Sequence, residues 1–357
     1  MHRRQAPQRR DGRAPRPPAH RGRPGHRART PRHGQGMSGP KVVALGGGHG
    51  LSASLAALRR LTDDLTAIVT VADDGGSSGR LRKDLGVLPP GDLRMALAAL
   101  CGDDEWGVTW SRVIQHRFRR EGELNGHAVG NLLLVGLWEL MDDPIAALDW
   151  MGRLLGAHGR VLPMSAVPLD IEADVAGHDP AHPERVSTVR GQAQVAVTPG
   201  DVRGIRLLPA DPPAVPEAVA AVRDADWVVV GPGSWFTSVL PHLLVPELAA
   251  ALVETKARRL LALNLAPQPG ETAGFSPQQH LEVLAAHAPA LTFDIVLGDR
   301  DRVEDVPGLE RATAALGGHV HLAPVSAVDG SPRHDPERLA SAYGRIFVDR
   351  ERIASWR

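Results

Sequence analysis

Two glycine-rich turns contain the residues with the clearest chemical potential. Each follows a short apolar run, and these runs end at Leu45 and Val230. The first turn is GGGHG (46–50) and the second is GPGS (231–234). Glycine lets a phosphate approach the main chain closely, and the free N–H groups that begin a following helix attract anions. Both turns are therefore predicted to hold the phosphates of a nucleotide.

Two adjacent acids, Asp73 and Asp74, follow the second apolar run, Leu65–Val71. In dinucleotide-binding folds, an acid at this place binds the hydroxyl groups of the ribose. In a transferase, the same pair would instead hold Mg²⁺ against a diphosphate. The loop continues as GGSSGRLRKD (75–84), whose serines and arginines would clamp phosphate or ribose, with a solvated surface loop as the alternative.

The first turn lies between elements that are typical of a nucleotide-binding sheet. An apolar run at 42–45 predicts a strand, and Leu51, Leu55 and Leu58 follow the turn at helical spacing. The segment GHGLSA (48–53) fits the relaxed GxGxxA pattern of dinucleotide sites. A glycine-rich turn without a ligand is the alternative, but the strand before it and the helix after it favour nucleotide binding.

Further apolar runs predict a mostly parallel sheet. Strands are expected, with helices between them, at 227–230, 260–265, 293–297 and 320–327. Polar loops follow the strands at 73–80, 231–238 and 264–272. Ligands of such sheets bind beyond the carboxyl ends of the strands. We therefore predict an α/β, Rossmann-like fold, with a mostly parallel sheet flanked by helices and the three loops converging on one crevice.

Residues 165–210 follow a different pattern, in which apolar and polar side chains alternate, as in LDIEADVAG and QAQVAVTPG. Alternation with a period of two, broken by Gly, Asp and Pro, predicts an antiparallel β insertion. His178 and His182 lie in a proline-rich turn of this insertion, and their spacing gives only weak support for a metal site.

Several helices have recognisable start signals. Asp92 precedes an apolar run and is predicted, on local grounds, to cap a helix at 93–100. Ser276, followed by Pro277, predicts another helix start. Further helices are expected at 106–119, 144–155 and 335–343.

Composition narrows the class of protein. Cys101 is the only cysteine among 357 residues, which excludes an internal disulfide framework and fits the reducing cytoplasm. No run of 18 apolar residues is present, so no transmembrane helix is expected. Residues 1–36 hold eleven Arg and one acid, while the remaining residues hold 30 basic and 40 acidic side chains. Because the rest of the chain is acidic, a nucleic-acid partner is not expected.

Residues 1–36 form an Arg- and Pro-rich extension without helical or strand periodicity, so disorder is expected there. A basic binding tail and a targeting peptide are alternatives, but the apolar segment of a secretory signal is missing. The favoured interpretation is that translation starts at Met37, shortly before the first strand. Residues 37–357 would then form a single nucleotide-binding domain.

Together, the motifs resemble those of the YvcK family, whose members are called gluconeogenesis factors, within the CofD-like superfamily. The resemblance rests on GGGHG (46–50), TVADDGGSSGRLR (70–82), PPGDLR (89–94), GHAVGNLLL (126–134), GPGSWFTSVLPHLLV (231–245) and QPGET (268–272). The sequence departs from the family pattern at Met95, Trp235-Phe236 and Ala266-Pro267. Met95 matters most, because it removes a polar side chain near the expected site.

The resemblance implies a CofD-like fold that binds a nucleotide sugar of the UDP-N-acetylglucosamine type. It favours a regulatory protein that links carbon metabolism and gluconeogenic growth to cell-wall synthesis and cell shape. Such a role requires no cofactor and is compatible with a homo-oligomer. One alternative is a CofD-type phospholactyl transferase that uses a nucleotide diphosphate donor and Mg²⁺. An NAD-dependent enzyme is a third hypothesis, and no catalytic residue is identified.

The candidate ligand-binding residues come from these motifs. Asn131, Thr237 and Asn264 would contact sugar or base, and Arg80 would offset phosphate charge. The full set is Gly46, Gly47, Gly48, His49, Gly50, Asp73, Asp74, Gly75, Gly76, Ser77, Arg80, Asp92, Asn131, Gly231, Pro232, Gly233, Ser234, Thr237, Asn264, Gln268 and Glu271.

Overall fold

The computed structural model describes residues 39–179, 181–268 and 270–354. The extension at 1–36, with its expected disorder, and the expected start at Met37 lie outside the described residues.

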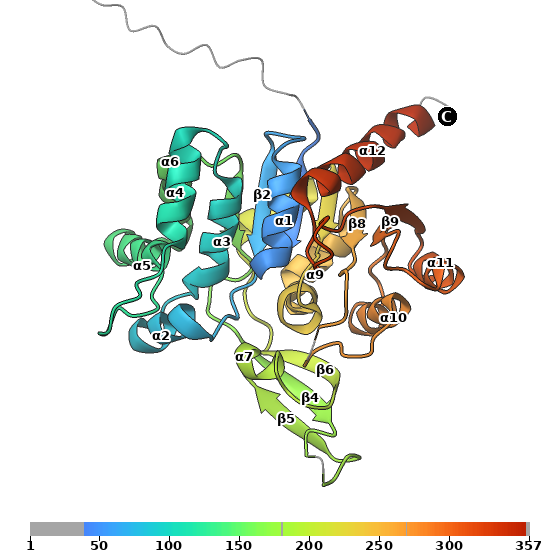
Figure 1. Ribbon diagram of the computed structural model, residues 1–357, viewed down its shortest axis with the longest axis horizontal. Helices are drawn as coiled ribbons and strands as arrows, with labels where there is room; N and C mark the ends of the chain where they lie inside the picture. Colours follow the sequence, from blue (N-terminus) through green and yellow to red (C-terminus); the bar gives the residue numbers. More distant parts are fainter. Residues whose placement is uncertain (1–38, 180, 269, 355–357) are drawn as a thin grey trace, which may run out of the picture. The chain divides into compact units, whose positions relative to one another are not determined.

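A seven-stranded sheet forms the centre of the described chain (Figure 1), in the order β10-β9-β8-β7-β1-β2-β3, and every neighbouring pair is parallel. The strands are β1 Val42–Gly46, β2 Leu65–Val69, β3 Arg160–Pro163, β7 Trp227–Val230, β8 Arg258–Ala262, β9 Ile295–Asp299 and β10 His319–Ala323. Those at the centre read as continuous apolar runs, because helices cover both faces of a parallel sheet. The predicted Rossmann-like α/β fold is confirmed.

The direction of strand progression reverses at β1, which pairs with β2 on one side and with β7 on the other. Val42 therefore lies between Leu65 and Trp227, two residues that are far apart in the sequence. Such a reversal leaves a crevice at the carboxyl ends of the two central strands. The glycine-rich turns follow these same two strands, so the fold brings them together.

Helices surround the sheet, and α1 packs against both α3 and α12 (Figure 1). The helices are α1 Gly48–Leu58, α2 Gly76–Leu85, α3 Pro90–Leu100, α4 Glu105–Gln115, α5 Val129–Met141, α6 Pro144–Leu155, α7 Gln192–Val195, α8 Pro216–Asp224, α9 Pro246–Glu254, α10 Pro277–His287, α11 Val306–Ala315 and α12 Pro336–Ala354. A π-helical turn, η1 Trp235–Val239, and a 3₁₀ turn, η2 Leu240–Leu244, follow β7.

The insertion is an antiparallel sheet of three strands, β4 Asp170–Ala176, β5 Val186–Arg190 and β6 Asp201–Leu208. Alternate residues of β4 are buried, as the sequence pattern predicts. The expected strand at QAQVAVTPG is wrong, because this segment contains the short helix α7. Gly191 adopts φ +99° before α7, which ends the strand pattern.

Two other local expectations need correction. Helix α3 begins at Pro90 with Pro89 as its N-cap, so Asp92 lies within the first turn and does not cap the helix. The expected helix at 106–119 is shorter, since α4 ends at Gln115.

Two helix predictions are confirmed by the structure. Helix α6 spans the expected residues, Pro144–Leu155. Ser276 caps α10 in a reciprocal capping box with Gln279.

Among the described helices, none is by itself both long and apolar enough to cross a membrane. The bent pair Trp235–Leu244 and Pro246–Glu254, with 81° between its halves, passes that test only when counted together.

Candidate functional site

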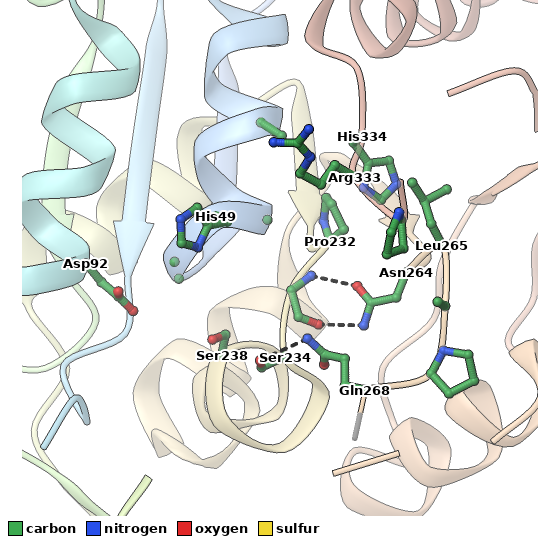
Figure 2. A pocket seen from close by; sticks show the side chains of 18 of the residues that line it. His49, Asp92, Pro232, Ser234, Ser238, Asn264, Leu265, Gln268, Arg333 and His334 are labelled. Carbon is green, nitrogen blue, oxygen red and sulfur yellow. Dashed lines mark hydrogen bonds between the residues drawn. The ribbon is translucent and has the colours of Figure 1, made fainter. Parts of the chain in front are cut away.

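A cavity of about 580 Å³ lies where the loops after β1, β7 and β8 meet. Figure 2 shows the side chains that line it, with His49 and Asp92 on one side and Asn264, Gln268 and His334 on the other. Its size falls in the range of roughly 300–1,000 Å³ that is typical of small-molecule sites. The lining residues are Gly47, Gly48, His49, Gly50, Ala53, Asp92, Gln192, Pro232, Gly233, Ser234, Ser238, Asn264, Leu265, Ala266, Pro267, Gln268, Pro332, Arg333 and His334.

The first glycine-rich turn opens α1 directly at the cavity. Gly47 is the N-cap of this helix, and no side chain caps it. A Cβ at Gly47 would lie 2.5 Å from Asp92 Oδ2, and one at Gly50 would lie 2.3 Å from the Pro232 carbonyl oxygen. Glycine is therefore required here because neighbouring groups approach the backbone closely. Because its N-cap residue supplies no side-chain acceptor, the start of α1 is suited to an anionic group.

The Asp92 carboxyl group lies beside this helix start. Burial, reinforced by the nearby Asp73, raises the pKa of Asp92 to about 7, while a hydrogen bond from the Gly48 N–H acts in the opposite direction. A negative charge at this position is therefore unfavourable unless a positive group approaches. Protonation of Asp92 near neutral pH would let an anion bind without charge repulsion.

The second glycine-rich turn is arranged differently, because Glu271 occupies the start of η1. Glu271 Oε2 accepts a hydrogen bond from the Phe236 N–H at 3.1 Å, and Oε1 accepts one from Thr237 Oγ1 at 2.7 Å. Burial raises the pKa of Glu271, and these hydrogen bonds oppose that rise. The expectation of free N–H groups at this turn is therefore wrong for Phe236, whose N–H binds an acid of the chain itself.

The side of the cavity formed by the loop after β8 holds the second turn in place. Asn264 accepts a hydrogen bond from the Gly233 N–H at 3.0 Å and donates one to the Gly233 carbonyl oxygen at 2.8 Å. Gln268 Nε2 donates to Ser234 Oγ at 3.1 Å (Figure 2). Gln268 Oε1 is buried and has no hydrogen-bond partner among the described residues. It is thus an acceptor that a ligand hydroxyl or N–H group would satisfy.

Several predicted site residues do not line the cavity, because the chain uses them internally. Asp74 accepts a hydrogen bond from the Ala193 N–H of α7 at 2.8 Å. Arg80 donates to the carbonyl oxygens of Glu123 and Asn125. The predicted residues away from the lining are Gly46, Asp73, Asp74, Gly75, Gly76, Ser77, Arg80, Asn131, Gly231, Thr237 and Glu271.

A fully buried network contains Asn131, which was expected to contact sugar or base. Asn131 Oδ1 accepts a hydrogen bond from Arg94 Nε at 2.8 Å, and Nδ2 donates to Ser77 Oγ at 3.0 Å. Ser77 Oγ also contacts His127 Nδ1 at 3.0 Å. Because Asn131 is fully buried, its amide supports the fold beside the cavity.

Asp73 and Asp74 do not fit the Mg²⁺ pair that a transferase would need. Asp74 turns toward α7, whereas Asp73 accepts a hydrogen bond from the Gly75 N–H at 2.9 Å and lies near Gly91. Within the described ranges, no group of three or more His, Cys, Asp or Glu side chains is arranged to hold a metal ion. No step is therefore assigned to a cation held by these two acids.

Sequence reasoning missed the part of the lining that comes from distant segments. Gln192 is contributed by the insertion, and Pro332, Arg333 and His334 come from the loop before α12. Arg333 is the one Arg or Lys among the described lining residues, and it is held by Asp329 at 2.8 Å. Burial lowers the pKa of His334 to about 4, so this side chain is neutral at physiological pH. No local sequence signal marked these residues.

The parallel sheet, with a cavity at the carboxyl ends of its central strands, places the protein among the doubly wound α/β proteins. The model of the family described as 2-phospho-L-lactate transferase CofD matches residues 42–316, and the chain belongs to this CofD family. Within it, the chain falls in the branch of the gluconeogenesis factors (the YvcK family).

Individual relatives support this placement. A Mycobacterium tuberculosis protein that carries the name gluconeogenesis factor provisionally is 58% identical over 303 residues, which cover 84% of this chain and 88% of that protein. The gluconeogenesis factor of Listeria monocytogenes is 36% identical over 314 residues, covering 85% and 94%. A crystal structure of a UPF0052 family protein from Bacillus halodurans superposes with a TM-score of 0.77 at 33% identity, covering 86% of this chain and 99% of that one.

The family model ends at residue 316, whereas Pro332, Arg333 and His334 lie beyond it. One wall of the cavity is therefore built by a segment outside the matched CofD region. The sequence resemblance alone gave no reason to include these residues.

Proposed function

We propose that the protein binds a nucleotide sugar of the UDP-N-acetylglucosamine type in this cavity and acts as a regulatory protein. The observation that carries the proposal is the start of α1, which opens into the cavity between the turns after β1 and β7 and whose N-cap residue, Gly47, has no side chain to occupy the N–H groups. This arrangement suits a diphosphate, because the first N–H groups of the helix lack partners within the helix.

The other lining groups suit the remaining parts of such a ligand. Arg333, at the rim, would offset phosphate charge in place of Arg80. The buried acceptor Gln268 Oε1 and the side chain of Gln192 would bind hydroxyl or N–H groups of the sugar or the base. Binding of this kind uses no nucleophile, and we infer that no cofactor is required.

The names of the relatives support a role in gluconeogenic growth. We propose that the bound nucleotide sugar reports the supply of cell-wall precursors, so that the protein couples carbon metabolism to cell-wall synthesis and cell shape in the cytoplasm. A regulator of this kind needs only that ligand occupancy changes its affinity for a partner.

Isothermal calorimetry on the full chain tests the ligand class. We expect micromolar binding of UDP-N-acetylglucosamine and at least tenfold weaker binding of GTP and NAD. Each titration is repeated with Mg²⁺, because a strict Mg²⁺ requirement would favour a CofD-type transferase. Absence of UDP-sugar binding in the micromolar range would overturn the proposal.

A pair of variants tests the position of the site. Asp74→Ala frees the N–H of Ala193, next to the lining residue Gln192, and should weaken binding several-fold. His178→Ala is the control, because its imidazole contacts Thr198 of the insertion and does not line the cavity. Equal effects of the two substitutions on the dissociation constant would contradict this placement of the ligand.

A further inference from the structure

A buried acid, Asp299, lies close to the site without lining the cavity. It is the last residue of β9 and is 3% exposed. Its Oδ2 atom accepts hydrogen bonds from the N–H groups of Val325 and Ser326, each at 2.8 Å. Its Oδ1 atom accepts one from the Asp301 N–H at 2.9 Å. Asp299 therefore ties the carboxyl end of β9 to the segment that follows β10.

The carboxyl group of Asp299 acts here as an anion. Burial by itself raises its pKa, but the hydrogen bonds from Val325, Asp301 and Ser326 together outweigh burial and leave the pKa below its ordinary value. An ionised carboxylate accepts stronger hydrogen bonds from N–H groups than a neutral acceptor does. At neutral pH, Asp299 thus holds the main chain of Val325 and Ser326 through charged hydrogen bonds.

The held segment is one strand of a short hairpin, residues 325–335, which we call the wall hairpin. Ser326 pairs with His334 in an antiparallel bridge. The Ala327 N–H donates to the Arg333 carbonyl oxygen at 2.8 Å. Because the two strands are paired, the position of the first strand fixes the position of the second.

The second strand of the wall hairpin carries the residues that face the cavity. Pro332, Arg333 and His334 are among the lining residues, and Figure 2 shows Arg333 and His334 on the same wall. Val325 packs into the core at the base of the hairpin, but the tip is largely exposed, with Val328 at 80%. Packing therefore contributes little to the position of the tip, and the hydrogen bonds at the base matter more.

His334 connects the wall hairpin to the loop after β8. Its imidazole hydrogen-bonds the main chain of Leu263, and the charge of Asp299 acts on it electrostatically. Leu263 directly precedes Asn264, which holds the second glycine-rich turn. A displaced hairpin would therefore disturb the wall of the cavity on both sides of His334.

We propose that Asp299 is a positioning residue for ligand binding, whose carboxylate fixes the wall hairpin so that Arg333 and His334 face the cavity. The inference rests on the proposed nucleotide-sugar ligand, because the role is measured as affinity. An acid that only stabilised the chain would leave the affinity of the folded protein unchanged when it is removed.

A double-mutant cycle on the full chain tests the proposal by calorimetry with UDP-N-acetylglucosamine. Asp299→Ala should weaken binding about tenfold in the wild-type chain. In a chain that already carries Arg333→Ala and His334→Ala, the same substitution should weaken binding less than twofold, because the groups that it positions are absent. A ratio below threefold between the two effects would overturn the proposal.

Asp305→Ala is the matched control for a general loss of stability. Asp305 also accepts a hydrogen bond from a main-chain N–H, that of Gly308, but it caps α11 and lies away from the cavity lining. Its removal should change the affinity less than twofold. If circular dichroism shows that Asp299→Ala is unfolded, Asp299→Asn takes its place under the same criterion, since the amide keeps an acceptor on one side only.

Amide hydrogen exchange separates a wrong ligand from a wrong role for Asp299. Without any ligand, Asp299→Ala should speed exchange at the N–H groups of Ala327 and Asp335 at least tenfold, and Asp305→Ala should not. If the wild-type chain binds no nucleotide sugar but these two groups are freed, the proposed ligand is wrong and the positioning of the hairpin stands. Unchanged exchange would overturn the inference whatever the ligand.

Discussion

The two glycine-rich turns look alike in the sequence but serve different purposes. The turn at 46–50 begins α1 without a side-chain cap and lines the cavity. The turn at 231–234 begins η1, where Glu271 accepts hydrogen bonds from Phe236 and Thr237. Both helix starts therefore meet a carboxyl group of the chain, Asp92 at the Gly48 N–H of α1 and Glu271 at η1, but the start of α1 also opens into the cavity.

This difference shows that a glycine-rich turn specifies backbone shape but not what the following helix start binds. Glycine permits the sharp turn and the close approach in both cases. The occupant is decided by a distant segment, which supplies Asp92 near the first turn and Glu271 at the second. The two turns differ because a ligand can approach beside Asp92, which lines the cavity, but not beside Glu271, which does not.

The largest expected effect is a loss of stability when Glu271 is removed from the glycine-rich turn at 231–234. Glu271→Ala would leave the Phe236 N–H and the Thr237 hydroxyl buried without an acceptor, and should lower the free energy of unfolding by about 3 kcal/mol. Chemical denaturation measures the change. Glu271→Gln keeps one acceptor oxygen and should cost about half as much. If the alanine variant loses less than about 0.5 kcal/mol, the acid is not what holds this turn.

The contact between the two turns is tested next. Gly50→Ala would place a methyl group 2.3 Å from the Pro232 carbonyl oxygen, which forces the turns apart. We expect a loss of about 2 kcal/mol in unfolding free energy and at least tenfold weaker nucleotide-sugar binding. The control is Gly48→Ala, which has open space but φ +57°, so its expected cost is about 1 kcal/mol. The reverse order of the two costs would contradict the close contact.

Asp92, beside the turn at 46–50, should make ligand affinity dependent on pH. Because the pKa of Asp92 is raised to about 7 in the folded protein, its contribution to stability is complete below its unfolded pKa, near 4, and is lost as pH rises through about 7. A bound diphosphate favours the protonated acid further. Affinity should therefore fall as pH rises above about 7, approaching tenfold per pH unit.

Calorimetry between pH 5.5 and 8.5 measures how the affinity for the ligand depends on pH. Each phosphate of a nucleotide sugar carries one ester bond and shares the anhydride bond, so neither has the second proton that a phosphomonoester loses near pH 6. Asp92→Asn should abolish the dependence, whereas His49→Gln, at another titratable residue of the lining, should retain it. An affinity that rises with pH only when Mg²⁺ is present would instead indicate a cation bound beside Asp92.

The smallest expected effect concerns the two arginines. Arg333→Ala should weaken ligand binding about fivefold, because its side chain is 75% exposed and its charge is screened by water and salt. Arg80→Ala should change the affinity less than twofold, since that side chain binds two carbonyl oxygens away from the cavity. Titration of each variant at low and high salt measures this contrast, and a stronger effect at Arg80 would place the phosphates elsewhere.

Much of the fold followed from local patterns in the sequence. The strand at Trp227–Val230, helix α6 and the Ser276 cap lie where the patterns predict them. These features depend on residues within a few positions of one another, so periodicity and capping signals are sufficient. The prediction that Asp92 caps the helix was wrong because α3 begins two residues earlier, at Pro90, and proline is well suited to the first helical position.

The candidate site was less predictable, because distant contacts decide which groups are available. His49, Asn264 and Gln268 lie at the cavity as expected, whereas the side chains of Asp74 and Arg80 are engaged elsewhere. The site also contains Gln192 and Arg333, which reach it through the insertion and through the loop before α12. No spacing rule connects such segments before the sheet has been assembled.

The position of β1 has a consequence for how the chain folds during synthesis. Val42 pairs with Leu65 early, but its other neighbour, Trp227, leaves the ribosome much later. Until then, one edge of this fully buried strand has no partner, and the loop closure that completes it is among the longest in the sheet. Nascent chains should therefore be prone to aggregation until β7 has emerged, and they would depend on chaperones during that interval.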